Sequence, residues 1–283
     1  MWKIKVLIQF VLAHMPCGEA INHRLQRVNA IRRGGAPCLR DRINEVDEGL
    51  QNLQRVKPLL GSVVVEVGTG WDALPTLLLR KLGAERIHTF DHLAHLRHNL
   101  AQSIGREIGL PDSEQLTLAG LLESNGINYV APGDATKTGL PDNSVDLFYS
   151  FAVLEHVPDS VAEALMTEAR RVLKPGGIWY SLIGLHDHYA GFDKSVSEVN
   201  FLRYPEWLWR LLVKNNISYH NRLRERDFLE MMARAGGEIV RIHHVQRPED
   251  VERVKAMKVD RHFAGYTPEE LAVTRTEIIA RFA

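Results

Sequence analysis

Cysteine is scarce in this sequence. The 283 residues include only two cysteines, Cys17 and Cys38, and both lie near the N-terminus. Two cysteines are too few for the disulfide framework that stabilises many small secreted proteins. We therefore expect reduced thiols in a cytoplasmic protein, with a single disulfide between the two as the alternative.

Long apolar runs and an excess of charge of either sign are also missing. No run approaches the roughly 18 apolar residues of a membrane-spanning helix, so no transmembrane segment is expected. Lys plus Arg total 35 and Asp plus Glu total 35, which gives a formal net charge of zero. No general field then attracts nucleic acid or an anionic membrane, and the 45% hydrophobic and 25% charged residues are typical of a globular protein.

The first residues carry an apolar pattern with two interpretations. Lys3 and Lys5 precede an apolar stretch from Val6 to Ala13, as in a signal peptide, but Gln9 and His14 interrupt it. The favoured interpretation is an amphipathic helix, with apolar residues at helical spacing: Ile4, Leu7, Ile8, Val11, Leu12 and Met15. Such a helix would pack on the domain, lie on a membrane surface, or cover a substrate pocket.

From about residue 62 the sequence alternates short β-branched runs with helical patterns, which is typical of βαβ units around a parallel sheet. The expected strands lie at 62–68, 86–91, 127–134, 145–154, 176–184, 237–245 and 274–282. The expected helices lie at 72–82, 93–109, 161–173 and 226–235. The alternation predicts an N-terminal helical extension at 1–60 and one domain at 61–283, with a helical, aromatic insert at about 185–225.

The strongest local motif is VVVEVGTGW at residues 63–71, a buried strand that leads into two glycines before a helix. Gly68 and Gly70 let the backbone approach a ligand closely. Asp91 ends the next expected strand, where a carboxylate can accept hydrogen bonds from both hydroxyls of a ribose. A nicotinamide dehydrogenase is one interpretation, but Glu66 within the strand would repel a pyrophosphate and suits a cationic ligand.

Five motifs in order, between about residues 61 and 183, resemble the class I S-adenosylmethionine-dependent methyltransferases of the methyltransferase-11 type. EVGTG at 66–70 resembles the first motif of that family, and Asp91 resembles its ribose-binding acid. Gly133-Asp134-Ala135 followed by LPDNSVD resembles the adenine-binding segment. SFAVLEHVPD at 150–159 resembles the motif of the fourth strand, and LKPGG at 173–177 the turn before the fifth.

The resemblance implies an α/β, Rossmann-like fold with a seven-stranded sheet, its last strand antiparallel, and helices on both faces. It also implies S-adenosylmethionine as the cofactor, held at the carboxyl ends of the strands. The residues implied to bind the cofactor are Glu66, Val67, Gly68, Thr69, Gly70, Asp91, Asp134, Ala135 and Ser150. Asp134 would meet the adenine amino group, and the Ala135 amide a ring nitrogen. Two simpler roles stay open, because Asp134 would also suit a turn and Glu66 would also suit an ion pair with an arginine.

Methyl transfer to a hydroxyl requires a base near the carboxyl ends of the fourth and fifth strands. His186, in GLHDHY after the fifth strand, is the first candidate, and Asp187 would orient an imidazole there. His188 and Tyr189 would form the pocket wall. His156, in LEHV after the fourth strand, is the second candidate, although it would equally cap a helix or order the cofactor loop.

The same histidines raise the question of a metal. The catechol O-methyltransferases of ubiquinone biosynthesis have a similar Glu-x-x-x-Glu-His arrangement near the position of Glu155 and His156. In that spacing the first glutamate lies four positions before the second, which here is Phe151; neither Phe151 nor the next residue, Ala152, is a ligand. We therefore expect no bound metal.

The insert has two interpretations, as a helical cover or as a surface that grips a sugar. It brings together aromatic and basic residues: Trp207, Trp209, Tyr219, His220, Arg222 and Arg224. SYHNRLR and the N-terminal LAHMPCG also resemble methyltransferases that modify sugars and bacterial surface polysaccharides. We expect O-methylation of a small-molecule or glycan hydroxyl. The alternatives are a C- or N-methyltransferase and a catalytically silent cofactor-binding partner subunit, which Asp72 in the glycine-rich turn would favour.

Overall fold

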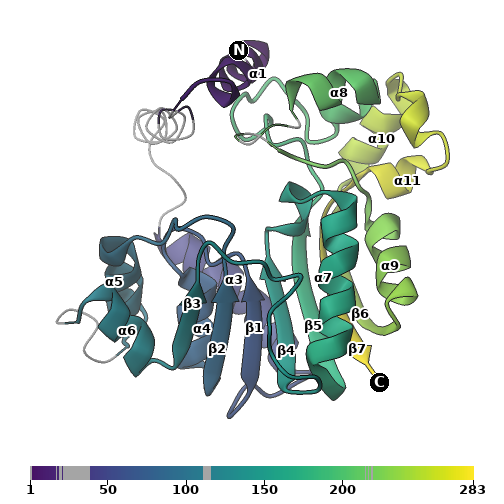
Figure 1. Ribbon diagram of the computed structural model, residues 1–283. Coiled ribbons are helices and arrows are strands. Elements are labelled where there is room, and N and C mark those ends of the chain that lie inside the picture. Colours follow the sequence, from purple (N-terminus) through teal and green to yellow (C-terminus); the bar gives the residue numbers. More distant parts are fainter. Residues whose placement is uncertain are drawn as a thin grey trace.

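A seven-stranded sheet forms the centre of the molecule in the computed structural model, which describes residues 2–16, 18, 21, 39–110, 116–213, 215, 217 and 219–283 (Figure 1). The strand order is β3-β2-β1-β4-β5-β7-β6. The strands are β1 Val63–Val67, β2 Arg86–Phe90, β3 Ile127–Val130, β4 Val145–Phe151, β5 Leu173–Gly184, β6 Gly237–Gln246 and β7 Val273–Phe282. β7 runs antiparallel to both of its neighbours, so the predicted sheet and its antiparallel last strand are confirmed.

The β-branched runs form strands because the sheet is covered on both faces. In β1 the side chains of Val64 and Val65 point to opposite faces, and both are completely buried. A strand buried on both faces has a continuous apolar sequence instead of an alternating one. This accounts for the uninterrupted VVVEV pattern of β1.

Helices cover the two faces, as expected. One face packs against α3 Leu39–Gln54, α4 Leu74–Lys81, α5 His98–Glu107 and α6 Leu118–Ser124. The other face packs against α7 Asp159–Val172 and α9 Glu225–Arg234. Leu50 and Leu53 of α3 belong to the same apolar core as Val64 of β1. Because α3 belongs to the predicted extension at 1–60 and yet shares the core of the sheet, the predicted domain boundary at residue 60 stays a prediction.

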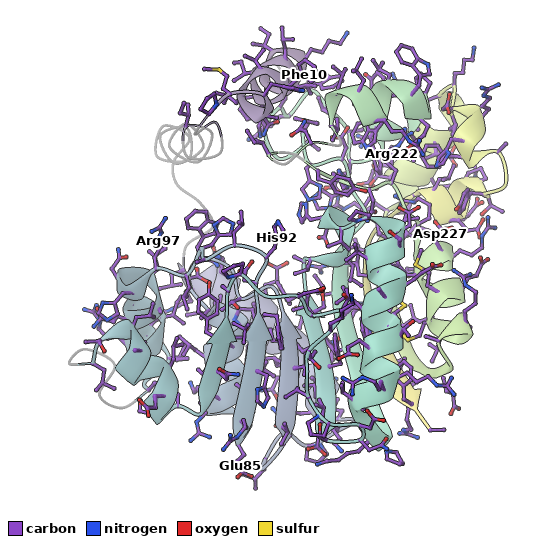
Figure 2. The ribbon with its side chains drawn as sticks, viewed as in Figure 1. Phe10, Glu85, His92, Arg97, Arg222 and Asp227 are labelled. Atoms are coloured by element: carbon purple, nitrogen blue, oxygen red, sulfur yellow. The ribbon has the colours of Figure 1, made fainter. Side chains whose placement is uncertain are left out.

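A third apolar cluster, which we call the cap, lies at the carboxyl end of the sheet. It joins α1 Trp2–Ala13 to the insert after β5, which carries η2 Asn200–Arg203 and α8 Glu206–Leu212. The segment between β6 and β7 also contributes to the cap and carries α10 Pro248–Ala256, η3 Arg261–Phe263 and α11 Pro268–Leu271. The sequence analysis did not predict these three helices. Figure 2 shows His92, which follows β2, at the end of the sheet nearer the cap residue Arg222, and Glu85, which precedes β2, at the opposite end.

The N-terminal helix α1 forms as predicted, but its predicted apolar stripe is not the packed face. The buried residues are Val6, Gln9 and Leu12, and the Tyr189 hydroxyl donates a hydrogen bond to Gln9 at 3.1 Å. Five of the six predicted stripe residues are exposed: Ile4, Leu7, Ile8, Val11 and Met15. Tertiary contacts with the insert select the face, because the polar Gln9 has a partner there. No helix in the described part of the chain has the length and apolarity needed to cross a bilayer.

Most of the aromatic and basic residues of the insert lie inside the cap. The Trp209 indole donates to the His220 carbonyl at 2.9 Å. Arg222 donates to the Tyr204 carbonyl at 2.5 Å and to Glu206 at 2.5 Å, and it is only 4% exposed. These side chains support the interpretation of the insert as a helical cover, and they are not available to grip a sugar.

Candidate functional site

The residues expected to hold a nucleoside lie in a row at the carboxyl ends of β1, β2 and β3. The Gly68 amide donates to the Phe90 carbonyl at 2.8 Å, which ties the end of β1 to the end of β2. The Asp91 carbonyl accepts from the Gly133 amide at 2.8 Å, which ties β2 to the segment after β3. Parallel pairing therefore brings Gly68, Asp91 and Asp134 to one edge.

The glycine-rich turn requires its glycines for two different reasons. Gly68 has φ +82°, and an added Cβ would lie 2.5 Å from the Val153 side chain. Gly70 has φ +70°, and a Cβ there would meet no atom within 4 Å. Side chains are disfavoured at both angles. The turn therefore packs closely at Gly68 and leaves open space above Gly70.

Glu66 is buried below this turn and holds two threonine hydroxyls. Its Oε2 accepts hydrogen bonds from Thr76 at 2.5 Å and from Thr89 at 2.6 Å. The hydroxyl of Thr69, at the turn, lies 2.6 Å from the hydroxyl of Thr89, so the two share a hydrogen bond. Glu66 therefore has threonine partners, not the arginine of the simpler interpretation. Its other oxygen, Oε1, has no hydrogen-bond partner among the described residues, and burial raises the pKa of Glu66 to about 7.

Asp91 is fixed by the turn that it faces. Its Oδ2 accepts from the Gly70 amide at 3.0 Å, and partial burial raises its pKa. Trp71, directly after the turn, stacks on His95 with ring centroids 4.6 Å apart. The Arg97 guanidinium lies over the Trp71 ring, 5.3 Å from its centroid. The sequence analysis did not single out this aromatic and cationic group, although Trp71 adjoins the glycines.

Asp134 is exposed and performs the turn role that the sequence left open. Its Oδ1 accepts from the Thr136 amide at 2.9 Å and from the Thr136 hydroxyl at 2.6 Å, which lowers its pKa. These bonds use only one carboxylate oxygen, so a second role at Oδ2 is compatible with them. Ala135 beside it is buried.

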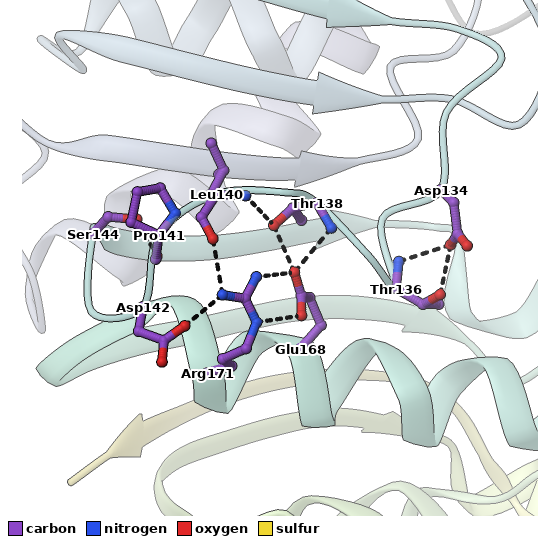
Figure 3. A network of polar contacts seen from close by, with 9 residues as sticks. All are labelled: Asp134, Thr136, Thr138, Leu140, Pro141, Asp142, Ser144, Glu168 and Arg171. Atoms are coloured by element: carbon purple, nitrogen blue, oxygen red, sulfur yellow. Dashed lines mark hydrogen bonds and ion pairs between the residues drawn. The ribbon is translucent and has the colours of Figure 1, made fainter.

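The segment after Asp134 is clamped to helix α7, as Figure 3 shows. Glu168 accepts from the Thr138 amide at 2.9 Å and from its hydroxyl at 2.6 Å. Arg171 donates to the Leu140 carbonyl at 2.8 Å and to Asp142 at 2.6 Å. The LPDNSVD part of the predicted adenine segment therefore leads away from the nucleoside row and serves as an anchor.

Ser150 lies in β4 beside the end of β1. It pairs with Val67 in one direction and with Ser181 in the other. Its side chain is completely buried, and its hydroxyl has no hydrogen-bond partner among the described residues. The site thus contains a second buried polar atom that lacks a partner, after Glu66 Oε1.

Histidines from two strand ends gather at the β4 and β5 part of the same edge. His156, in η1 Leu154–His156, meets His188 edge to face with ring centroids 4.9 Å apart. His188 stacks on His186 at 4.8 Å, with an angle of 3° between the rings. His188 therefore lies between the two predicted bases. His220, from the insert, is 4.1 Å from His188 and completes the cluster.

Burial favours the neutral form of His186 and His188. Burial lowers the pKa of His186 and lowers that of His188 to about 3. His186 Nδ1 lies 3.3 Å from the Thr274 carbonyl. Asp187, which we expected to orient an imidazole, instead accepts from the Tyr189 amide at 2.8 Å and from Asn200 at 3.0 Å. That prediction is wrong, because the Asp187 carboxylate stabilises the loop after β5.

A pocket of about 330 Å³ opens beside His186. It is lined by His186, Ala190, Gly191, Lys194, Val196, Ser197, Glu198, Arg247 and Arg253. Arg247 donates to Glu198 at 2.8 Å. Three basic side chains and one carboxylate give the pocket a polar, positively charged lining. None of the basic residues could be assigned to a site from sequence, because they come from the loop after β5 and from the segment after β6.

The comparisons with known proteins agree with this geometry. Residues 65–181 match a family model described as a methyltransferase domain. A sterol 24-C-methyltransferase from Gibberella zeae is 33% identical over 124 residues, which cover 44% of this chain and 27% of that protein. The match thus spans about a quarter of the length of this curated relative.

Solved structures share the fold at low sequence identity. The cyclase SpnF has a TM-score of 0.55 and 19% identity, covering 93% of this chain and 94% of that one. The geranyl diphosphate C-methyltransferase from Streptomyces coelicolor A3(2) has a TM-score of 0.51 and 14% identity, covering 84% and 81%. Residues 65–181 are therefore similar to a methyltransferase domain, and the solved structures share the fold of this chain.

Proposed function

We propose that this protein transfers a methyl group to a hydroxyl oxygen of a small molecule or glycan, with His186 as the base. The observation that carries the proposal is the position of His186, a neutral imidazole that lines a polar pocket just beyond the end of β5. S-adenosylmethionine, when bound, supplies the electrophilic methyl group. The chain has to hold the cofactor, orient the acceptor and remove one proton.

The residues at the ends of β1 and β2 suit the cofactor. Asp91 presents a carboxylate beside the open space at Gly70, where it can accept hydrogen bonds from the two ribose hydroxyls. The unpaired Oε1 of buried Glu66 suits the amino group of the methionine part, because burial strengthens an ion pair. Val67, Thr69, Ala135 and Ser150 complete the proposed cofactor site, with Asp134 directed to the adenine.

The glycine-rich turn does not favour a catalytically silent subunit. Asp72 forms an ion pair with Arg42 of α3 at 2.7 Å and accepts from the Leu74 amide at 3.2 Å. These partners hold Asp72 at the start of α4. The carboxylate therefore binds the first amide of α4, and it leaves the space at Gly70 open.

Proton removal falls to His186. A base contributes about 10² to 10⁴-fold to such a reaction, and it must be neutral to accept a proton. Burial favours the neutral imidazole because it lowers the pKa of His186. Lys194 and Arg247 in the same pocket suit an acceptor that carries oxygen atoms or negative charge. The pocket offers less to a purely apolar acceptor.

C-methylation is the second candidate, and the likeness to a sterol 24-C-methyltransferase favours it. Transfer to carbon would not need His186 as the base for a hydroxyl. Turnover with tritiated S-adenosylmethionine and fractionated cell extract identifies the acceptor fraction. We expect His186→Ala to lower this turnover about 10²-fold or more.

The control measurements separate binding from chemistry. Affinity for S-adenosylhomocysteine should stay near wild type in His186→Ala, because the residue lies in the acceptor pocket. His156→Ala is the matched variant for the second predicted base. If His156→Ala abolishes turnover while His186→Ala retains it, His186 is not the base and the chemistry depends on His156. Full turnover in both variants contradicts O-methylation by this cluster.

A further inference from the structure

Three side chains at the ends of β4 and β5 converge in a way that linear spacing did not reveal. Glu155 and His156 follow β4, and His188 follows β5. One potential ligand atom from each of the three lies within 4.8 Å of the other two. The expectation of no metal rested on Phe151 and Ala152, but the third donor comes from a different strand.

Both imidazoles are held with Nε2 available. His156 Nδ1 lies 2.9 Å from the Tyr219 carbonyl, and His188 Nδ1 lies 3.1 Å from the His186 carbonyl. A carbonyl oxygen only accepts, so each Nδ1 donates its hydrogen, and each Nε2 keeps a lone pair. Metal-binding histidines are oriented by this kind of bond between the other ring nitrogen and a carbonyl.

Glu155 supplies a carboxylate oxygen that lacks a partner. Its Oε1 accepts from the Gly184 amide at 2.9 Å. Its Oε2 has no hydrogen-bond partner among the described residues, although the residue is only 2% exposed. No lysine or arginine of the described chain forms an ion pair with it. A buried, unpaired carboxylate oxygen is unfavourable, and a cation would satisfy it.

We propose that Glu155, His156 and His188 bind a divalent first-row transition metal ion. Two imidazoles and one carboxylate are a donor set suited to zinc and its neighbours, whereas magnesium prefers oxygen ligands alone. Three protein ligands leave a coordination position open for water or an oxygen atom of a small molecule. Val153, two residues before Glu155, touches Gly68, so the metal site adjoins the glycine-rich turn.

The role of the ion in methyl transfer rests on the proposed function. Binding of the ion to the three side chains does not depend on that function. A metal at this position would bind the acceptor hydroxyl and favour its ionised form. His186, stacked on His188, would then act beside the metal. The binding test below uses neither cofactor nor acceptor, so its outcome is independent of the reaction catalysed.

The experiment is a calorimetric titration of the chelator-treated full chain with Zn²⁺, and with Mg²⁺ for comparison. We expect wild type to bind one Zn²⁺ per chain and to show no comparable binding of Mg²⁺. Glu155→Gln, of the same shape, and His156→Ala, at an exposed position, should each weaken Zn²⁺ binding about 100-fold or more. Zn²⁺ held by the thiols of Cys17 or Cys38 would survive both substitutions.

Matched controls make the result decisive. His98→Ala removes an exposed histidine whose ring also contacts a backbone carbonyl, and it should leave Zn²⁺ binding unchanged. Thermal unfolding checks folding without metal, and Zn²⁺ should raise the midpoint of wild type but not of Glu155→Gln. Absence of stoichiometric Zn²⁺ binding by wild type overturns the proposal. Undiminished binding in either variant also overturns it.

Discussion

His156 and His188 meet edge to face with ring centroids 4.9 Å apart, although they follow different strands. Their proximity follows from the parallel pairing of β4 and β5, in which Phe151 lies opposite Leu182. The loops that follow the two strands therefore lie at the same edge of the sheet. The chemistry of the site therefore depends on strand order more than on any local motif.

A buried guanidinium, that of Arg224, ties the cap to the sheet. Arg224 donates to the Leu185 carbonyl at 2.8 Å and also to the carbonyls of Leu271 and Val273. Arg224→Met should lower the free energy of unfolding by about 3 kcal/mol or more, because buried carbonyls lose their donors. Urea unfolding measures this change.

Arg226, two residues later, is the control for this prediction. It is partly exposed and pairs with Glu270 at 3.0 Å. Arg226→Met should leave the free energy of unfolding nearly unchanged, because exposed ion pairs contribute little. Equal effects of the two substitutions would contradict the anchoring role of Arg224.

Glu66 should make stability depend on pH. Burial raises its pKa in the folded state to about 7 from 4.5, so the folded protein binds the proton more tightly than the unfolded chain does. Stability from this group is complete below pH 4.5 and is lost as the pH rises through 7. Glu66→Gln keeps an oxygen for Thr76 and Thr89 but does not titrate.

The measurement compares urea unfolding of wild type and Glu66→Gln at pH 5 and pH 8. From pH 5 to pH 8, wild type should lose about 1 to 3 kcal/mol relative to the glutamine variant. Parallel pH profiles of the two proteins would show that Glu66 is ionised in the folded state throughout this range.

The strands and the nucleoside row could be predicted from sequence because both depend on local signals. A continuous run such as VVVEV marks a strand covered on both faces, and Gly68, Gly70 and Asp91 follow strand ends. The resemblance implied seven strands with the last one antiparallel, which the structure confirms.

The cap and the histidine cluster could not be predicted, because long-range contacts determine them. α1 packs through Gln9 because Tyr189 provides a partner, so its more apolar face is exposed. Asp187 adjoins two histidines in sequence, yet it binds Asn200 and the Tyr189 amide. His188 joins His156 only through the pairing of β4 with β5.

The segment that carries Asp134 should lose order when its anchor on α7 is removed. Glu168 accepts two hydrogen bonds from Thr138. Because hydrogen bonds to a charged group contribute about 1.5 to 3 kcal/mol, Glu168→Ala should speed amide exchange at Thr138 about 10- to 100-fold. Glu163→Ala, at an exposed position of α7, is the control and should leave this amide protected. Unchanged exchange in Glu168→Ala would contradict the anchor.

The central claim is that the edge formed by β1 and β2 binds S-adenosylmethionine through Asp91. Calorimetric titration with S-adenosylhomocysteine tests it most directly, with wild type and Asp91→Ala compared under the same conditions. We predict that wild type binds the ligand and that the variant binds it about 1 to 3 kcal/mol more weakly, since two ribose hydroxyls lose a charged acceptor. Equal affinity in the two proteins, or binding of NADH as strong as that of S-adenosylhomocysteine, would contradict the account.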